Sequence, residues 1–233
     1  MFNNKLTFIA EIGMNHNGNF GLFSELIKQA AFSGADFAKF QLGWRDSPGE
    51  INALSLDDIG LIFKLCDFYN IQPLFSVITE DAFFRLRDNF DPVAYKIASR
   101  TVKDNPNLVE LVLQTNKPVI CSLGMWNSSA LPFNHNNISY LWCKSLYPTL
   151  PWDLSGFPKE YNPSEVMGYS DHTVGIEASL IAIQRGASII EKHFTLDKSD
   201  TSIRDHALSA TPDEFSQLVS IGRSIHRLIS LGV

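Results

Sequence analysis

The sequence predicts a closed (β/α)8 barrel, the TIM barrel, near the short end of the size range for that fold. Eight short apolar runs recur along the 233 residues, and most are followed by a stretch whose apolar residues have helical spacing. Alternating strands and helices imply a parallel sheet, and eight such units favour closure into a barrel. An open doubly wound sheet with two extra strands is the alternative. No linker divides the chain, so residues 1–233 are expected to form a single catalytic domain.

The first half of the chain is expected to supply four strands and three helices. Apolar runs predict strands over residues 6–12, 36–41, 72–78 and 93–99. Helical spacing predicts helices over residues 21–33, 54–69 and 80–88. Ser55 and Thr79 stand at the starts of the second and third helices, where their side chains are expected to act as N-caps.

The second half continues the same alternation with weaker helices. Apolar runs predict strands over residues 117–122, 138–145, 164–169 and 187–190. Helices are expected over residues 107–115, 175–185 and 212–231, the last with Thr211 as N-cap and Pro212 in its first turn. Residues 125–137 and 147–162 are rich in Asn, Ser and Pro, so helices five and six of the barrel are expected to be shortened.

Composition excludes several classes of protein. The net charge of −6 argues against a nucleic-acid binder that relies on overall charge. Three cysteines, Cys66, Cys121 and Cys143, fall in apolar segments without a framework spacing, which indicates reduced thiols and a cytoplasmic protein. No signal peptide is evident, and no apolar run is long enough to cross a bilayer.

The last two predicted strands each lead into a polar cluster that contains a histidine. His172 follows the seventh strand, and Glu191 and His193 share one face at the end of the eighth. Neighbouring parallel strands deliver these groups to the same end of the barrel. Two imidazoles, a carboxylate and open positions suit a catalytic divalent metal. The alternative is that each histidine only bonds to the backbone, but their paired placement favours a metal site.

Lys39 and Lys96 each lie inside an apolar strand. A buried lysine is unfavourable unless it is paired, so two of them at one barrel mouth indicate a bound anion such as phosphate or carboxylate. They can also pair with a barrel glutamate, for example Glu11 or Glu191, and both interpretations can hold together. A Schiff-base lysine in a metal-free aldolase is a third possibility.

Other polar residues gather at the expected carboxyl ends of the strands, where the catalytic groups of such barrels lie. Asp171 is expected either to orient His172 or to cap the following helix. Lys144 and Lys192 have the opposite strand parity and are expected to face the helix layer or its edge. No glycine-rich phosphate loop of the nucleotide-binding types is present. The strand-end groups are Glu11, Asn15, His16, Gln41, Ser76, Ser99, Ser122, Ser145, Tyr147 and Ser170.

Six segments resemble, in order, the motifs of the sialic acid synthase family. The resemblance covers residues from about 8 to 228, and its last two motifs together are highly specific. The six segments span residues 9–18, 34–41, 95–99, 117–122, 168–175 and 191–197.

The resemblance implies an enzyme that condenses phosphoenolpyruvate with an N-acetylated mannosamine or related sugar on a (β/α)8 barrel. It implies a divalent metal, most often Mn²⁺ with Mg²⁺ or Co²⁺ as alternatives, bound by His172 and His193. Phosphoenolpyruvate is expected at Lys39, Lys96, Ser99 and Ser170. Sugar or reacting-centre contacts are expected from Glu191, Gln41, Tyr147 and Asp205. Of these, Glu191, Lys39 and Lys96 are the predicted catalytic groups, and the substrate-binding set is completed by Glu11, Asn15, Ser76, Ser122 and Ser145.

Several departures from the family pattern bear on the sugar. Val77 and Ile78 replace the usual Thr-Pro after Ser76, which is expected to remove a phosphate-contacting hydroxyl, and Ser145 replaces an asparagine. Ile203-Arg204 replaces Gly-Pro, and only residues 42–53 follow the second strand, where the family has a long insertion.

The family's C-terminal antifreeze-like domain, which carries an arginine into a partner's site, is expected to be missing. Arg45, Arg100 and Arg204 are candidate substitutes, and either a homodimer or a partner chain that supplies the domain is expected. Two alternative functions stay open. One is a condensing enzyme or aldolase for a different keto sugar acid. The other is a non-catalytic barrel that binds phosphoenolpyruvate and sugar without turnover.

Overall fold

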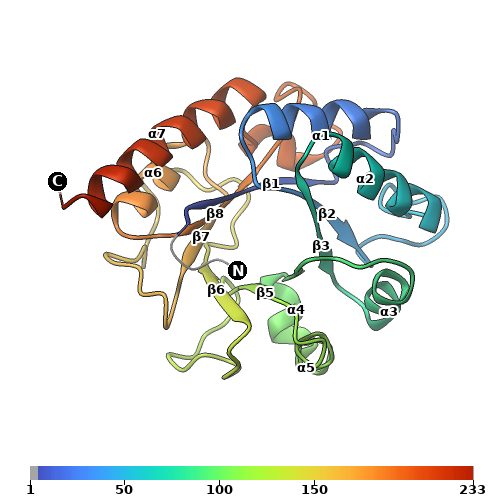
Figure 1. Cartoon of the computed structure of the whole chain (residues 1–233), viewed down its shortest axis with the longest axis horizontal. Coiled ribbons are helices and arrows are strands. Elements are labelled where there is room, and N and C mark those ends of the chain that lie inside the picture. The colour runs from blue at the N-terminus through green and yellow to red at the C-terminus, as the bar shows by residue number, and fades with distance from the viewer. Residues whose placement is uncertain (1–4, 233) are drawn as a thin grey trace.

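The computed structural model describes residues 5–232 and confirms the predicted fold. Eight parallel strands close into a barrel in chain order, and helices surround them (Figure 1). The strands are β1 Thr7–Gly13, β2 Phe37–Leu42, β3 Gln72–Val77, β4 Tyr95–Ile97, β5 Val119–Ser122, β6 Ile138–Trp142, β7 Gly168–Asp171 and β8 Ile189–His193. The helices are α1 Leu22–Phe32, α2 Leu56–Phe68, α3 Glu80–Asn89, α4 Ser99–Asp104, α5 Pro106–Leu113, α6 Glu177–Gln184 and α7 Pro212–Ser230, with a short 3₁₀ helix, η1, at Arg204–Leu208.

Two concentric apolar layers hold the barrel together. The inner layer fills its lower end with one residue from each strand or the position just before it: Ile9, Phe37, Leu74, Ala94, Ile120, Leu141, Met167 and Ile189. The alternate strand positions pack outward against the helices. Above the inner layer, the inward positions become polar, and the barrel opens there at the carboxyl ends of its strands.

Side-chain capping explains where three helices begin. The hydroxyls of Ser55, Thr79 and Thr211 accept hydrogen bonds from backbone N–H groups in the first turns of α2, α3 and α7, as predicted. The carboxylates of Asp58 and Glu214 accept hydrogen bonds from the backbone N–H groups of Ser55 and Thr211 and complete capping boxes.

Three local predictions differ from the structure. Helix α4 begins at Ser99, with Ala98 alone between it and β4, whereas a strand was expected as far as residue 99. Strand β7 begins at Gly168, four residues later than expected, because Asn162 and Val166 form an isolated antiparallel bridge before it. Strand β6 ends at Trp142, so Ser145 lies in the loop beyond it. The expected erosion of two helices is confirmed, since residues 123–137 and 143–167 contain no helix (Figure 1).

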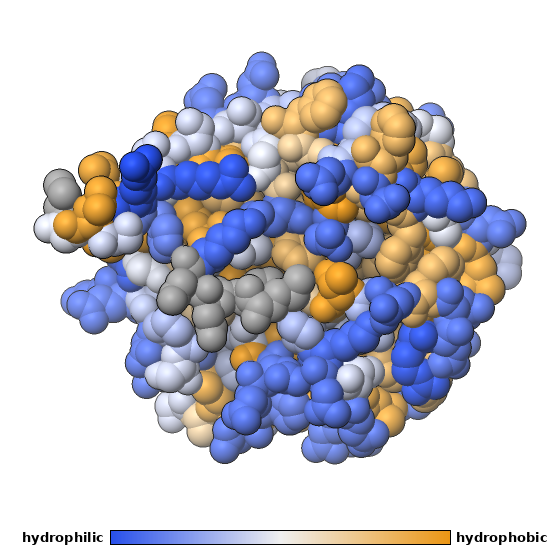
Figure 2. All heavy atoms as spheres, viewed as in Figure 1, coloured by the Kyte–Doolittle hydropathy of each residue, from blue (hydrophilic) through white to orange (hydrophobic). Residues whose placement is uncertain are grey.

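The surface is mainly hydrophilic on the face seen in Figure 2, with apolar side chains scattered among the polar ones. Among residues 5–232, no helix has the length and apolar character needed to span a membrane. All three cysteines are buried as free thiols.

Candidate functional site

A cavity of about 720 Å³ lies at the carboxyl ends of the strands. Such an end is where loops and strand termini assemble the sites of (β/α)8 enzymes. Fourteen of the fifteen residues predicted to form the site line it: Glu11, Lys39, Gln41, Ser76, Lys96, Ser99, Ser122, Ser145, Tyr147, Ser170, His172, Glu191, His193 and Asp205.

The floor of the cavity is formed by two groups of polar side chains, and Lys39, on β2, is the central residue of the first group. Its Nζ lies 2.8 Å from Oε2 of Glu11 and 3.5 Å from Oε2 of Glu191, and it donates a hydrogen bond to the Ser76 hydroxyl at 3.2 Å. The Gln41 amide donates to the other oxygen of Glu11 at 3.0 Å. Adjacent parallel strands place these groups together, since Glu11 and Lys39 are partners in the β1–β2 register.

Lys96, on β4, forms the other half of the floor. Its Nζ donates to the Ser122 hydroxyl at 2.7 Å and lies 3.4 Å from Oε1 of Glu191. Ser170 donates to the same Glu191 oxygen at 2.7 Å. Glu191 therefore joins the two lysines, and the alternative expectation, that each lysine pairs with a barrel glutamate, is confirmed. This pairing does not exclude an anion, because a ligand can replace a carboxylate as partner.

Burial and pairing shift the pKa values of these groups in different directions. Burial alone would raise the pKa of Glu191, but Lys39 and Lys96 outweigh it and lower that pKa to about 2. Burial raises the pKa of Glu11 in spite of Lys39. The two carboxylates raise the pKa of Lys39 against the effect of burial, whereas burial lowers the pKa of Lys96. Two lysines are thus matched by two carboxylates on the floor, and an anionic ligand would take the place of a carboxylate beside the lysine ammonium groups.

His172, just after β7, and His193, at the end of β8, form one wall of the cavity. Their imidazole rings lie side by side, with 5.4 Å between the ring centroids. Burial lowers the pKa of each to about 4, and the neighbouring His193 adds to the effect on His172. Both imidazoles are therefore neutral at pH 7, as ligation of a metal requires.

The tautomer of His172 is fixed by the backbone. Its Nδ1 lies 2.8 Å from the Lys144 carbonyl oxygen, which can only accept, so Nδ1 carries the proton. Nε2 is left with the lone pair, and the Tyr147 hydroxyl donates to it at 3.2 Å. An imidazole anchored through one nitrogen with its other lone pair directed into a cavity is the usual arrangement of a metal-binding histidine.

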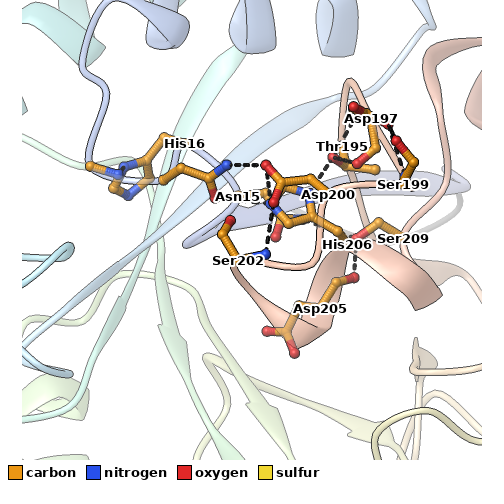
Figure 3. Close-up of polar contacts among 12 residues, drawn as sticks. Asn15, His16, Thr195, Asp197, Ser199, Asp200, Ser202, Asp205, His206 and Ser209 are labelled. Atoms are coloured by element: carbon orange, nitrogen blue, oxygen red, sulfur yellow. Dashed lines mark hydrogen bonds and ion pairs between the residues drawn. The ribbon is translucent and has the colours of Figure 1, made fainter.

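Asp205 is presented by η1 beside the histidine pair. Its Oδ2 lies 4.0 Å from Nδ1 of His193, and neither that nitrogen nor Oδ1 of Asp205 has a hydrogen-bond partner in the described chain. Figure 3 shows the Asp205 carboxylate pointing to the opposite side from His206. His206 fixes η1 instead, through its bonds to the Thr195 hydroxyl at 2.7 Å and to the Asn17 side chain at 2.9 Å.

Asn15 is the one predicted site residue that does not line the cavity. Its amide donates at 2.9 Å to the Phe194 carbonyl oxygen and at 2.9 Å to the Ser209 hydroxyl. Asn15 thereby ties the loop after β1 to the chain on either side of η1, which is a structural role. His16 also lies away from the cavity and packs on Phe23 with 5.1 Å between centroids.

Val77 was expected to remove a phosphate-contacting hydroxyl from the site, but its position does not face the cavity. Its side chain is buried in the outer layer between β3 and the helices, and the next residue, Ile78, is the one that lines the cavity. Lys144 also differs from expectation, because it lines the cavity, where it pairs with Asp153 at 3.3 Å.

Asp171 and Lys192 form a fully buried ion pair behind the site, 3.3 Å apart. Asp171 also accepts hydrogen bonds from Thr173, Tyr169 and, at 2.6 Å, Ser179 of α6. It therefore anchors the turn that carries His172, rather than bonding to that imidazole or capping α6. Lys192 faces the helix layer as predicted.

Several cavity residues were not predicted from the sequence, among them Trp44, Lys103 and Cys143. The Cys143 sulfur lies 3.1 Å from the Ser99 hydroxyl. Cys143 follows directly after the end of β6, so its place in the cavity is set by the loop rather than by the strand. Lys103 could not be placed without knowledge of α4.

The residues present fit a divalent metal in part. Among residues 5–232, no group of three or more His, Cys, Asp or Glu side chains is arranged to hold an ion. The protein offers two neutral imidazoles, with the Asp205 carboxylate nearby. Open positions left for substrate and water are typical of catalytic rather than structural metal sites.

Comparisons of the sequence and of the structure with known proteins point to the same family. A family model described as NeuB family matches residues 50–232. The chain is 30% identical to the N,N'-diacetyllegionaminic acid synthase of Campylobacter jejuni, over 98% of this chain and 79% of that protein. It is 30% identical to the N-acetylneuraminate-9-phosphate synthase of Mus musculus, over 95% and 70%. The crystal structure of the N-acetylneuraminic acid synthetase of Leptospira borgpetersenii in complex with citrate superposes with a TM-score of 0.85, at 29% identity, over 97% of this chain and 86% of that one.

Proposed function

Because this chain belongs to the NeuB family, we propose that it condenses phosphoenolpyruvate with an N-acetylated amino sugar of the N-acetylmannosamine type. The products would be a nonulosonic acid and inorganic phosphate. The observation that carries this proposal is the pairing, in one cavity, of a floor with two buried lysines and a wall with two neutral histidines. The relatives named above support the reaction class, since their names specify synthases of nonulosonic acids.

Phosphoenolpyruvate fits the floor. Lys96 and the hydroxyls of Ser99, Ser122 and Ser170 form a cationic, hydroxyl-rich surface suited to phosphate, while Lys39 and Ser76 suit the carboxylate. Both lysines are held by glutamates in the structure, so the substrate would exchange one anionic partner for another. This arrangement keeps the lysines charged and positioned before the substrate arrives.

His172 and His193 would hold a divalent cation, most simply Mn²⁺ with Mg²⁺ or Co²⁺ as alternatives. When bound, such an ion polarises the aldehyde of the open-chain sugar. Tyr147 and Asp205 flank the histidines and would orient the sugar and the attacking water.

The bond changes balance without a further reactant. The C3 carbon of phosphoenolpyruvate attacks the sugar aldehyde, whose oxygen takes up a proton and becomes a hydroxyl. Water adds to the resulting cation at C2 and loses a proton, for which the cavity offers three carboxylates as acceptors: Glu11, Glu191 and Asp205. The C2 hydroxyl then gives its proton to the departing phosphate as the bond between C2 and the phosphate oxygen breaks, which leaves the 2-keto acid and inorganic phosphate. The lysines stabilise the phosphate and carboxylate charge throughout.

A Schiff-base aldolase is the second candidate, and one observation favours it. Burial lowers the pKa of Lys96, which is the change that makes a lysine amine nucleophilic. Borohydride reduction in the presence of pyruvate would trap such an adduct on Lys96, whereas the condensing enzyme gives no trapped adduct.

The test of the proposal is phosphate release from phosphoenolpyruvate with N-acetylmannosamine, with and without Mn²⁺. Release that requires both and is abolished by His172→Ala supports the enzyme. Binding of phosphoenolpyruvate without release, across a panel of amino sugars, would show instead a non-catalytic barrel. Sedimentation of the full chain would show whether it is a homodimer, which we propose as the default for a small enzyme of this kind.

A further inference from the structure

A charged residue stands directly before each histidine of the cavity wall. Asp171 precedes His172, and Lys192 precedes His193. We propose that the buried ion pair between Asp171 and Lys192 positions the two imidazoles relative to each other, and that it thereby sets how tightly the protein binds a divalent cation. This inference rests on the metal site that is part of the function proposed above, and it makes Asp171 and Lys192 positioning residues of that site.

The register of β7 and β8 places the ion pair directly behind the histidines. Asp171 and Lys192 are partners across the two strands, one residue before each imidazole. Because side chains alternate along a strand, the pair faces the helix layer while the histidines face the cavity. Nζ of Lys192 lies 3.3 Å from Oδ2 of Asp171, and neither side chain is exposed. The register partner of Lys192 on β1 is the uncharged Ala10, so the ion pair joins β8 to β7.

Stability alone does not account for a charged pair at this place in the outer layer. Replacing a buried ion pair with apolar residues is often neutral or stabilising. The barrel uses apolar residues at similar outward positions near the ends of other strands, namely Leu42, Val77, Ile97 and Cys121. What an apolar pair could not provide is a set of directional hydrogen bonds.

These hydrogen bonds fix the residue that follows His172. The N–H and the hydroxyl of Thr173 each donate to Oδ1 of Asp171 at 2.7 Å, and Nζ of Lys192 donates to the Thr173 carbonyl oxygen. Ser179 of α6 donates to Oδ2 of Asp171 at 2.6 Å and holds the carboxylate in place. The ion pair therefore fixes both backbone neighbours of His172, and it does so from the residue next to the other histidine.

The position of His193 depends on its backbone more than that of His172 does. The His172 ring is anchored through Nδ1, 2.8 Å from the Lys144 carbonyl oxygen. Among residues 5–232, Nδ1 of His193 has no hydrogen-bond partner. Two imidazoles share one cation only if a nitrogen of each lies about 2 Å from it. The link from Lys192 to the turn after β7 is therefore what keeps the two rings at a fixed separation.

The experiment measures Mn²⁺ binding by calorimetric titration of the full chain in wild type, Lys192→Met and the double variant Asp171→Leu, Lys192→Met. The double variant removes both buried charges, so its Tm should lie closer to that of wild type than the Tm of Lys192→Met does. Both variants should nevertheless bind Mn²⁺ about 10- to 100-fold more weakly, the range for loss of groups that orient metal ligands. Val112→Ala, on the buried face of α5 and away from the cavity, is a destabilised control that should keep the wild-type affinity.

Co²⁺ gives a second measurement, because its visible absorption bands report the geometry of its ligands. These bands should differ between wild type and the double variant. An unchanged Mn²⁺ affinity with an unchanged Co²⁺ spectrum in the double variant would overturn the inference. Phosphoenolpyruvate affinity that falls as much as Mn²⁺ affinity would also overturn it, since that would indicate a general disturbance of the cavity.

If wild type binds neither Mn²⁺ nor Co²⁺, the metal site of the proposed function fails, and crystal structures of the metal-free proteins decide the inference separately. The double variant must then show His172 displaced from the Lys144 carbonyl oxygen, or a separation between the two imidazole rings that differs from the 5.4 Å of wild type. Unchanged positions of both rings would overturn the inference.

Discussion

Glu191 and Lys96 form an ion pair at the floor of the cavity, with 3.4 Å between Oε1 and Nζ and almost no solvent access to either side chain. The same carboxylate lies 3.5 Å from Lys39. One residue of β8 thus neutralises cations from β2 and β4. The pair explains how two lysines are tolerated inside a barrel and how an anionic substrate finds them charged.

Glu191→Gln is expected to lower the free energy of unfolding by on the order of 3 kcal/mol, because it leaves two buried lysines with one carboxylate between them. Saturating phosphoenolpyruvate should restore part of this loss, so its stabilising effect on Tm should be larger in the variant than in wild type. Thermal unfolding with and without ligand measures both. Glu160→Gln, at an exposed position, is the control, and an equal ligand shift in wild type and variant would contradict the expectation.

Asp171→Asn is expected to destabilise the protein by about 3–5 kcal/mol, since Lys192 would keep a buried charge without its counterion. Removing both charges, in Asp171→Leu with Lys192→Met, should recover most of the loss. Denaturant unfolding is the measurement, with Asp88→Asn as a surface ion-pair control that changes stability by less than about 1 kcal/mol. A double variant as unstable as the single one would show that the hydrogen bonds of Asp171, rather than its charge, matter.

Tyr147→Phe is expected to tighten Mn²⁺ binding by about 3- to 10-fold, because the hydroxyl that occupies the lone pair of His172 Nε2 would no longer have to be displaced. Calorimetric titration of the full chain with Mn²⁺ tests this, and Tyr69→Phe, at the C-cap of α2 and away from the cavity, serves as the control. Weaker binding by Tyr147→Phe would instead indicate that the hydroxyl helps to hold the ion.

The metal-free protein is expected to lose stability as pH falls from about 6.5 to about 4. Both histidines have a folded pKa of about 4, lowered by burial from 6.5, so in this window the unfolded chain binds protons that the folded chain does not. The free energy of unfolding therefore rises with pH across the window and is constant with respect to these groups above it. Each histidine contributes on the order of 3 kcal/mol. The double variant His172→Asn, His193→Asn should show a flatter profile, and an unchanged profile would refute the assignment.

The fold and most of the site could be predicted because the signals are local and repeated. Each strand is an apolar run, and its carboxyl end is marked by a change to polar residues, so strand parity sorted Lys39, Lys96, Glu191 and His193 into one cavity. Helix α4 was missed because Ser99–Asp104 follows β4 without a turn residue and is too short to show apolar periodicity.

The residues whose placement was predicted wrongly are positioned by contacts or by element ends that the local sequence does not show. Asn15 stands after a strand like the true site residues, but its side chain turns to the Phe194 carbonyl oxygen, 179 residues away in sequence. Val77 has the parity of the outer layer, which follows once the register of β3 with β2 is known. Lys144 was assigned by parity as though β6 continued, whereas β6 ends at Trp142.

Phosphoenolpyruvate labelled with ¹⁸O at its bridging oxygen provides the most direct test of the proposed condensation. With N-acetylmannosamine and Mn²⁺, the label should appear in inorganic phosphate, in step with formation of the keto acid, and only when an acceptor is present. Lys96→Met and His172→Ala should each abolish the transfer. Label retained in pyruvate or in the sugar product, or phosphate released at the same rate without an acceptor, would contradict condensation in this cavity.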